Sequence, residues 1–104
     1  MTTSRNITPF IALVGNTPTM RIVDFLISNA PYNFNKTQIS ERIGISKKTL
    51  YNAWTILEEF NIVKTISSDG RSRFYVLNKE TPITRTLIKL HASTTTHVLG
   101  DTND

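Results

Sequence analysis

The sequence contains no cysteine and only two histidines, His91 and His97. Disulfide bonds and zinc sites built on thiolates are therefore excluded, and two histidines do not replace a cysteine ligand set. The chain also shows no nucleophile–base set, no paired carboxylates and no metal-ligand spacing. We therefore expect a protein that is not an enzyme and that carries no cofactor and no metal.

Long apolar segments are also missing. No apolar run approaches the ~18 residues that a membrane-spanning helix needs. The first ten residues, MTTSRNITPF, lack the apolar core of a secretory signal. These absences predict a cytoplasmic protein with no membrane partner. With 104 residues, 38% of them hydrophobic, we expect one modest core in a single domain.

Acidic residues are fewer than basic ones. Twelve Lys and Arg against eight Asp and Glu give a formal net charge of +4, and the sequence pI is about 9.7. This balance suits a polyanionic ligand. Many unrelated small domains are as basic, so the positions of the basic residues must decide what the charge means.

The central segment predicts two helices across a tight turn. Asn35 suits the N-cap of a helix over residues 36–43, with Ile39 and Ile43 on its inner face, and Gly44 supplies the turn. Ser46 then suits the N-cap of a second helix. Apolar residues recur in that helix at i, i+4 and i+7 and predict one inward stripe. The stripe consists of Leu50, Trp54 and Leu57.

A hairpin is predicted directly after these helices. Residues 62–67 and 73–77 are rich in β-branched and aromatic side chains, and Ser68-Asp69-Gly70-Arg71-Ser72 separates them. Asp-Gly between two such runs is a strong hairpin signal. The order of elements predicts a mainly α fold with a small β-hairpin, which is a winged helix-turn-helix in a single domain.

The flanking segments complete the predicted organisation. Residues 1–14 are assigned to an N-terminal arm, although Pro9 within the apolar run Ile7–Val14 leaves a strand or a short helical turn open. Residues 15–92 form the winged-helix domain, which has helices beginning near Pro18 and Pro82. The inner stripe expected for the last helix is Ile83, Leu87 and Leu90. Residues 93–104 are predicted to be a flexible tail.

The helix after Ser46 carries the residues expected to contact DNA. If its apolar stripe faces the core, the opposite face presents side chains that can bind base edges or phosphate, because an α-helix fits the major groove. Asn52 can pair with adenine, and lysine can donate to guanine or phosphate. The helix N-terminus itself attracts phosphate. The predicted DNA-binding residues on this helix and its cap are Ser46, Lys47, Lys48, Thr49, Tyr51, Asn52 and Thr55.

Both basic clusters have an ordinary alternative. Lys47 and Lys48 can be a solvated helix start, although cations there oppose the macrodipole by up to ~1 kcal/mol each, which a phosphate would offset. Arg71 and Arg73 can reach phosphate or the minor groove from the hairpin tip, or simply keep the hairpin soluble. Lys36 is a phosphate contact or a solvated side chain. The offset of the dipole cost favours DNA binding for the two lysines, and the place of the wing directly after a helix-turn-helix favours it for the two arginines, while both interpretations of Lys36 stay open.

The segment GISKKTLYNAWTILEEFNIV resembles the helix-turn-helix core of ArsR/MarR-type winged-helix regulators, with Asn61 where the pattern usually has Gly. The wider stretch from Leu13 to Ala92 is similar to a group of small archaeal winged-helix transcriptional regulators. The phrases that carry this wider likeness are LVGNTPTMRIVDFLI and NKETPITRTLIKL. The Cys and His metal-sensing sites of many ArsR-type members are absent from this sequence.

The resemblance implies a homodimer that binds double-stranded DNA at a pseudo-palindromic operator, within the nucleoid. The helix after Ser46 would read the major groove, and Arg71 and Arg73 would contact the flanking backbone. Half-sites would then lie ~34–36 Å apart. The dimer surface is expected on the helix that begins near Pro82, together with either the helix that follows Thr17 or the segment Ile7–Val14.

Three other roles remain open for the same fold. A centromere-binding partition protein or a chromatin protein would also bind DNA. A protein-interaction winged helix would use the same face for a protein partner and would not bind DNA. The sequence separates these roles poorly, because they share one arrangement of residues.

Overall fold

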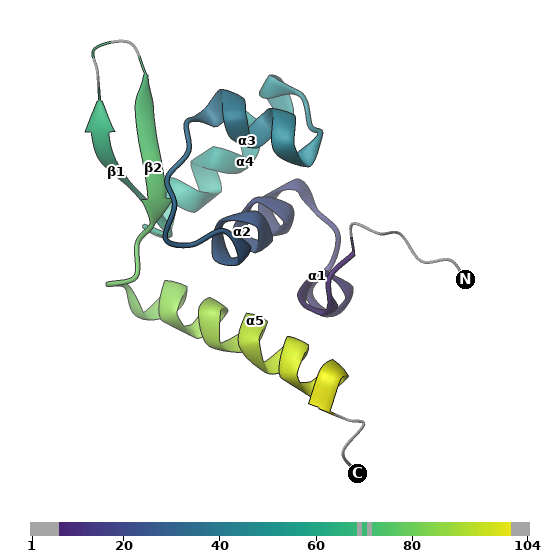
Figure 1. Ribbon diagram of the computed structural model, residues 1–104. Coiled ribbons are helices and arrows are strands. Elements are labelled where there is room, and N and C mark those ends of the chain that lie inside the picture. Colours follow the sequence, from purple (N-terminus) through teal and green to yellow (C-terminus); the bar gives the residue numbers. More distant parts are fainter. Residues whose placement is uncertain (1–6, 69, 71, 101–104) are drawn as a thin grey trace.

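The computed structural model describes residues 7–68, 70 and 72–100. These residues form five helices and one β-hairpin. Figure 1 shows α2 between two groups of elements: α3, α4 and the hairpin on one side, and α5 on the other. This is the predicted winged helix-turn-helix. The described elements are α1 (Pro9–Val14), α2 (Pro18–Ser28), α3 (Lys36–Ile43), α4 (Lys47–Glu59), β1 (Val63–Ser68), β2 (Arg73–Leu77) and α5 (Pro82–Gly100).

The helix starts follow from local capping, as predicted. The Asn35 side chain accepts from the Gln38 backbone N–H at 2.8 Å, and the Gln38 side chain accepts from the Asn35 backbone N–H at 2.9 Å. This reciprocal pair satisfies two backbone donors at the start of α3. Gly44 ends α3 in the left-handed conformation at φ 73°, which costs glycine little. The turn between α3 and α4 is therefore encoded by the residues at its ends.

The hairpin confirms the predicted wing. β1 and β2 are antiparallel, from Val63 opposite Leu77 to Ser68 opposite Arg73, and a register irregularity lies between Thr65 and Ser67. Because a bulge strengthens local twist, the outer half of the hairpin can turn relative to its base. Asp69 and Arg71, which were predicted at the tip, lie outside the described residues.

A short bridge ties the hairpin to the segment before α3. The Phe34 N–H donates to the Tyr75 carbonyl at 3.0 Å, and the Tyr75 N–H donates to the Phe34 carbonyl at 2.8 Å. The bridge holds β2 beside the start of α3. It therefore brings wing residues close to Lys36.

The core lies where the apolar stripe of α4 meets α2. The predicted inward residues of α4 are buried, and Trp54 is only 1% exposed. Three α2 side chains face them: Ile22, Val23 and Leu26. Of the two residues predicted on the inner face of α3, Ile39 is buried and Ile43 is partly buried against the core.

The N-terminal segment differs from the predicted arm. Thr8 caps α1, and Pro9 occupies the first helical position, so the proline that interrupted the apolar pattern marks a helix start. Phe10 and Ile11 are fully or almost fully buried in the core. Residues 9–14 thus belong to the folded domain. Residues 1–6 lie outside the described part of the chain.

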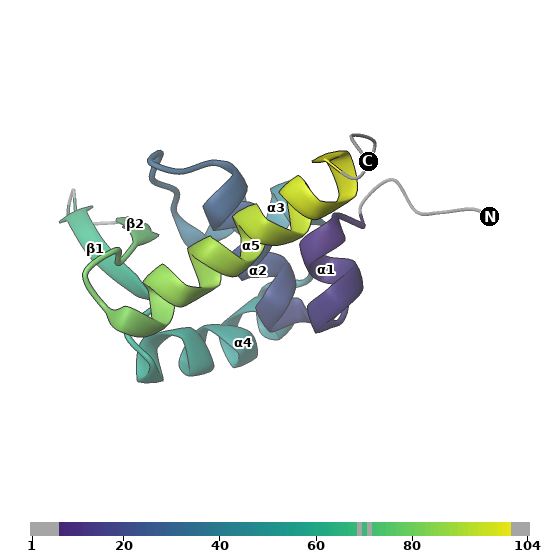
Figure 2. The same cartoon turned by 90° about the horizontal axis from the view of Figure 1, so that it is seen from below.

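The last helix differs from its prediction in two ways. Ile83 is 45% exposed and Thr84 is buried in its place, whereas Leu87 and Leu90 pack against the core as predicted. The helix also continues through the predicted tail to Gly100, and Figure 2 shows its C-terminal end beside α1. Residues 101–104 lie outside the described residues.

A polar contact joins α5 to α2. The Nε2 atom of His91 lies 2.8 Å from Oδ1 of Asp24 in α2. The Thr8 hydroxyl, which caps α1, donates to the same carboxylate oxygen at 3.0 Å. Because His91 is seven residues after Thr84, both side chains face the body of the protein. None of the helices in the described ranges combines the length and apolarity needed to cross a membrane.

Candidate nucleic-acid interface

The face of α4 opposite the core is polar and exposed. Five of its predicted DNA-binding residues are exposed to solvent, and Thr49 is half-buried. The exposed five are Lys47, Lys48, Tyr51, Asn52 and Thr55. The two lysines occupy the first turn, while Glu58 and Glu59 stand at the opposite end of the helix. The positive charge is therefore concentrated at the end of α4 that helix-turn-helix proteins insert into the major groove.

Tyr51 and Asn52 lie on opposite edges of this face. Tyr51 borders a notch shared with α3 and β2, whereas Asn52 and Thr49 border a shallow depression next to Pro18 at the start of α2. No hydrogen-bond partner of the Asn52 side chain occurs among the described residues. Its amide is thus available for an external partner, on the side of α4 away from the hairpin.

Three of the predicted residues are engaged in local hydrogen bonds. The Ser46 side chain accepts from the Thr49 N–H at 3.1 Å, and its hydroxyl donates to the Thr49 hydroxyl oxygen at 3.0 Å. The Thr55 hydroxyl donates to the Tyr51 carbonyl at 3.2 Å. These bonds stabilise the cap and the body of α4. They leave Lys47, Lys48, Tyr51 and Asn52 as the more available part of the predicted set.

Lys36 has a more elaborate setting than the sequence indicated. Its ammonium nitrogen lies 4.7 Å from the ring centroid of Tyr51, 5.4 Å from that of Trp54 and 5.6 Å from that of Tyr75. All three distances fall within the range of a cation–π interaction. Nothing in the sequence pattern places Tyr75 beside Lys36, because that contact depends on the bridge between Phe34 and β2.

The notch beside Lys36 connects the helix-turn-helix to the wing. It has a volume of about 350 Å³. Lys36 and Arg73 supply positive charge to its lining, and Tyr51 and Ser72 supply hydroxyl groups. Arg73 is exposed at the start of β2. Of the two predicted wing arginines, Arg73 therefore joins the α4 face through this notch, whereas Arg71 lies outside the described residues.

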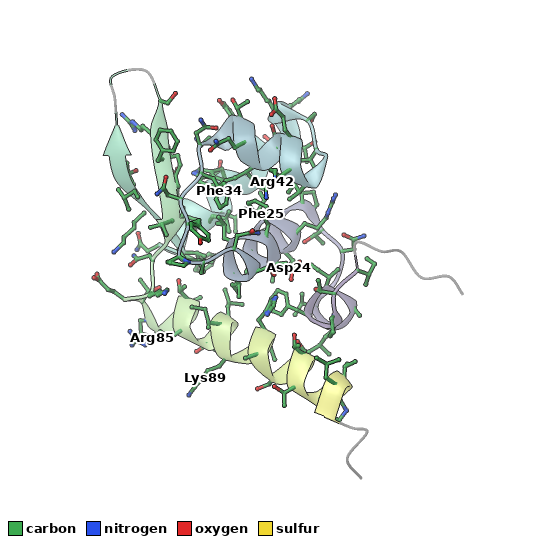
Figure 3. The ribbon with its side chains drawn as sticks, viewed as in Figure 1. Asp24, Phe25, Phe34, Arg42, Arg85 and Lys89 are labelled. Atoms are coloured by element: carbon green, nitrogen blue, oxygen red, sulfur yellow. The ribbon has the colours of Figure 1, made fainter. Side chains whose placement is uncertain are left out.

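Two basic side chains of α5 point away from this interface. Figure 3 shows Arg85 and Lys89 projecting from the face of α5 that is turned away from α3 and α4. The Arg85 guanidinium donates to the backbone carbonyls of Lys79 and Glu80, at 3.3 and 2.9 Å. Arg85 and Lys89 therefore lie away from the helix-turn-helix.

A second cluster of rings surrounds Arg42 on the other side of α3. Its guanidinium carbon lies 5.5 Å from the ring centroid of Phe25 and 5.7 Å from that of Phe34, and Figure 3 shows these three side chains gathered between α2 and α3. The cluster joins α3 to α2. Within residues 7–68, 70 and 72–100, no group of three or more His, Cys, Asp or Glu could hold a metal ion.

Comparison with known proteins identifies the fold. No protein-family model matches the sequence, and no curated protein matches it. Among solved structures, a double mutant of Lactococcus lactis ZitR is similar, with a TM-score of 0.64 and 21% identity over 88% of this chain. The adhesin competence repressor AdcR of Streptococcus pyogenes gives a TM-score of 0.61 at 16% identity over 85% of the chain. The chain has a MarR-like winged-helix fold.

The similar structures include proteins in complex with their ligands. Wild-type ZitR bound to DNA gives a TM-score of 0.58 at 22% identity, over 88% of this chain and 60% of ZitR. Staphylococcus aureus MarR with salicylate and kanamycin gives a TM-score of 0.61 at 19% identity, over 90% of this chain and 61% of MarR. The chain spans about three fifths of the length of ZitR, and 63% of AdcR. These proteins are bacterial, and the archaeal origin expected from the sequence stays a prediction.

Proposed function

We propose that this chain is a homodimeric, sequence-specific double-stranded DNA-binding protein that regulates transcription. In this proposal α4 enters the major groove and the hairpin tip contacts the flanking backbone or minor groove. The exposed face at the start of α4, beside the wing, carries the proposal. The DNA complex of ZitR, a MarR family member with the same fold, supports it.

The residues of this face divide into three proposed roles. Lys47 and Lys48 contact phosphate or guanine at the N-terminus of α4, where the helix dipole also favours an anion. Asn52 reads adenine, because its amide can donate to N7 and accept from N6 of that base. Ser46, Thr49 and Thr55 mainly hold the shape of α4 and offer their remaining hydrogen-bonding capacity to the backbone.

Replacement of Asn52 with Ala tests the reading role. We expect the free energy of binding to the preferred site to weaken by ~1–3 kcal/mol, with little change on random DNA, because a bidentate pair discriminates one base from the others. The measurement is a competition titration of the preferred duplex against a scrambled one. Equal losses on both duplexes would show that Asn52 does not read a base.

The dimer would use the apolar surface between α1 and α5. A groove of about 480 Å³ lies there, and its lining is mostly apolar. Leu13 and Leu99 are 63% and 68% exposed in the same region, so a partner that covered the groove would bury them. Helix α2, which begins after Thr17, does not fit this role, because it is packed between the other elements. A second copy that covers the groove would place two α4 helices for adjacent half-sites.

Replacement of Leu13 with Glu tests this surface. We expect a dimer of the wild-type chain and a folded monomer of the variant at micromolar concentration, because a charge in an apolar contact disfavours association while an exposed site tolerates it. Multi-angle light scattering measures both masses. The matched control is Ile66→Glu in β1, 47% exposed and far from the groove, which should stay dimeric. A monomeric wild-type chain would refute the dimer.

The alternative roles predict other binding behaviour. A partition protein would bind clustered repeats and spread along them, and a chromatin protein would bind without regard to sequence. A protein-interaction winged helix would give no mobility shift with DNA, and a Lys47 and Lys48 double substitution would have little effect in that assay. Titrations with single sites, clustered repeats and scrambled duplexes therefore separate these roles from that of a transcriptional regulator.

A further inference from the structure

The ammonium group of Lys36 is held where three elements meet. Lys36 begins α3, Tyr51 and Trp54 come from α4, and Tyr75 comes from β2. The Trp54 and Tyr75 rings are themselves packed edge to face, with centroids 4.9 Å apart. Two of the rings belong to the buried core, so their positions are fixed by packing. The cation is thus held in place before any ligand arrives.

The aromatic rings attract the positive charge of Lys36 but do not accept ordinary hydrogen bonds from its N–H groups. A lysine ammonium has three N–H donors and no acceptor. Ring faces attract the cation electrostatically, and no protein hydrogen-bond acceptor for this ammonium is found among the described residues. Lys36 is also half-buried, so part of its hydration is already lost. Both features favour an anionic acceptor on the open side of the ammonium, which is the notch.

The lining of the notch specifies the chemistry of that anion. Lys36 and Arg73 are positively charged, Thr37, Tyr51, Ser72 and Tyr75 carry hydroxyl groups, and none of the described residues that line the notch is a carboxylate. A phosphodiester offers two non-bridging oxygens that share one negative charge, and arginine binds phosphate oxygens in bidentate fashion. The notch lies between α4 and β2, the two elements proposed to touch DNA. A backbone phosphate of the bound duplex would therefore pass across it.

We propose that this notch holds one DNA phosphate through the Lys36 ammonium, the Tyr51 hydroxyl and the Arg73 guanidinium. The inference rests on the proposed function, since it concerns how the same DNA is held. Because the three groups come from α3, α4 and β2, one phosphate fixes the recognition helix and the wing in a single register on the duplex. Lys36 is then a contact that sets this register, and the aromatic rings are its support.

A scan of neutral phosphates tests the proposal. The full chain is titrated with duplexes of its preferred site in which single phosphates are replaced, one at a time, by uncharged methylphosphonate. For the wild-type chain we expect a position between the α4 and wing footprints where neutralisation weakens binding about tenfold, as for a hydrogen bond to a charged group. For Lys36→Met, which keeps the apolar stem over the rings, the same replacement should have no effect.

Two further variants sharpen the test. Tyr51→Phe keeps the ring but removes the hydroxyl, so the penalty at the same position should shrink without vanishing. Lys64→Met is the matched control, because Lys64 lies in β1 and pairs with Glu80 at 3.8 Å. It removes one positive charge outside the notch and should leave the whole scan unchanged. Circular dichroism checks that each variant is folded.

The outcomes distinguish this inference from the proposed function. If the wild-type chain binds no duplex, the proposed function itself fails. If DNA is bound but the scan of Lys36→Met matches that of the wild-type chain, the phosphate contact is overturned while DNA binding stands. A notch that binds inorganic phosphate tightly while the scan shows no sensitive position would also overturn it, because the ligand would then be a free anion.

Discussion

Simultaneous replacement of Lys47 and Lys48 with Ala is expected to weaken DNA binding by about 10²–10⁴-fold, because each lysine gives up a hydrogen bond of a charged group to the DNA. The slope of log affinity against log salt should also become shallower by up to ~1.8, at ~0.9 for each lost phosphate contact. Both effects should appear on preferred and random duplexes if the lysines contact phosphate. Fluorescence anisotropy titrations over a range of salt concentrations measure them.

The stability of this double variant provides an internal check. Cations in the first turn of α4 oppose the helix dipole, so their removal should leave the free energy of unfolding unchanged or raised by up to ~1 kcal/mol each. Loss of binding would then not be caused by loss of fold. The matched control replaces Lys79 and Lys89, which line one depression along α5, and removes the same net charge. If both double variants lost affinity equally, the face of α4 would have no special role.

Replacement of Trp54 with Ala should lower the free energy of unfolding by ~3–5 kcal/mol, a large part of the ~5–15 kcal/mol that holds a small domain together. Trp54 is 1% exposed and packs against Tyr75, so its removal leaves a cavity between α4 and β2. Urea denaturation measures the change. It should be followed by circular dichroism, because Trp54 is the only tryptophan and the variant loses the fluorescence signal.

Two further variants test whether that loss of stability comes from removing a core side chain. Trp54→Phe should cost less than Trp54→Ala, because it keeps an aromatic ring and removes an indole N–H that is buried without a partner within the described residues. Ile56→Ala on the exposed side of α4, where Ile56 is 44% exposed, should cost under about 1 kcal/mol. If Trp54→Ala cost no more than Ile56→Ala, the assignment of Trp54 to the core would be contradicted.

Sequence patterns predicted those parts of the molecule that depend on neighbouring residues. The caps at Asn35 and Ser46 and the turn at Gly44 are all local features, and the structure confirms them. The separation of α4 into a buried stripe and an exposed face is also local, because helical periodicity alone decides it. The exposed half of the candidate interface was therefore predictable.

Features that depend on contacts between distant segments were not predictable in this way. The contact of His91 with Asp24 joins α5 to α2, and helix α1 is stabilised by packing of Phe10 and Ile11 into the core. The aromatic rings around Lys36 meet only because Phe34 pairs with Tyr75. A lysine between two polar residues carries no sequence signal of such a setting. The notch is therefore a product of the fold.

The central claim is that the exposed face of α4 binds double-stranded DNA in a sequence-dependent manner. The most direct measurement selects the preferred duplex from a random pool and compares its affinity with that of a scrambled duplex, by fluorescence anisotropy at about 0.15 M salt. We expect a ratio of affinities on the order of 10³ or more in favour of the selected duplex. Equal affinity for both duplexes, or binding to neither, would contradict the claim.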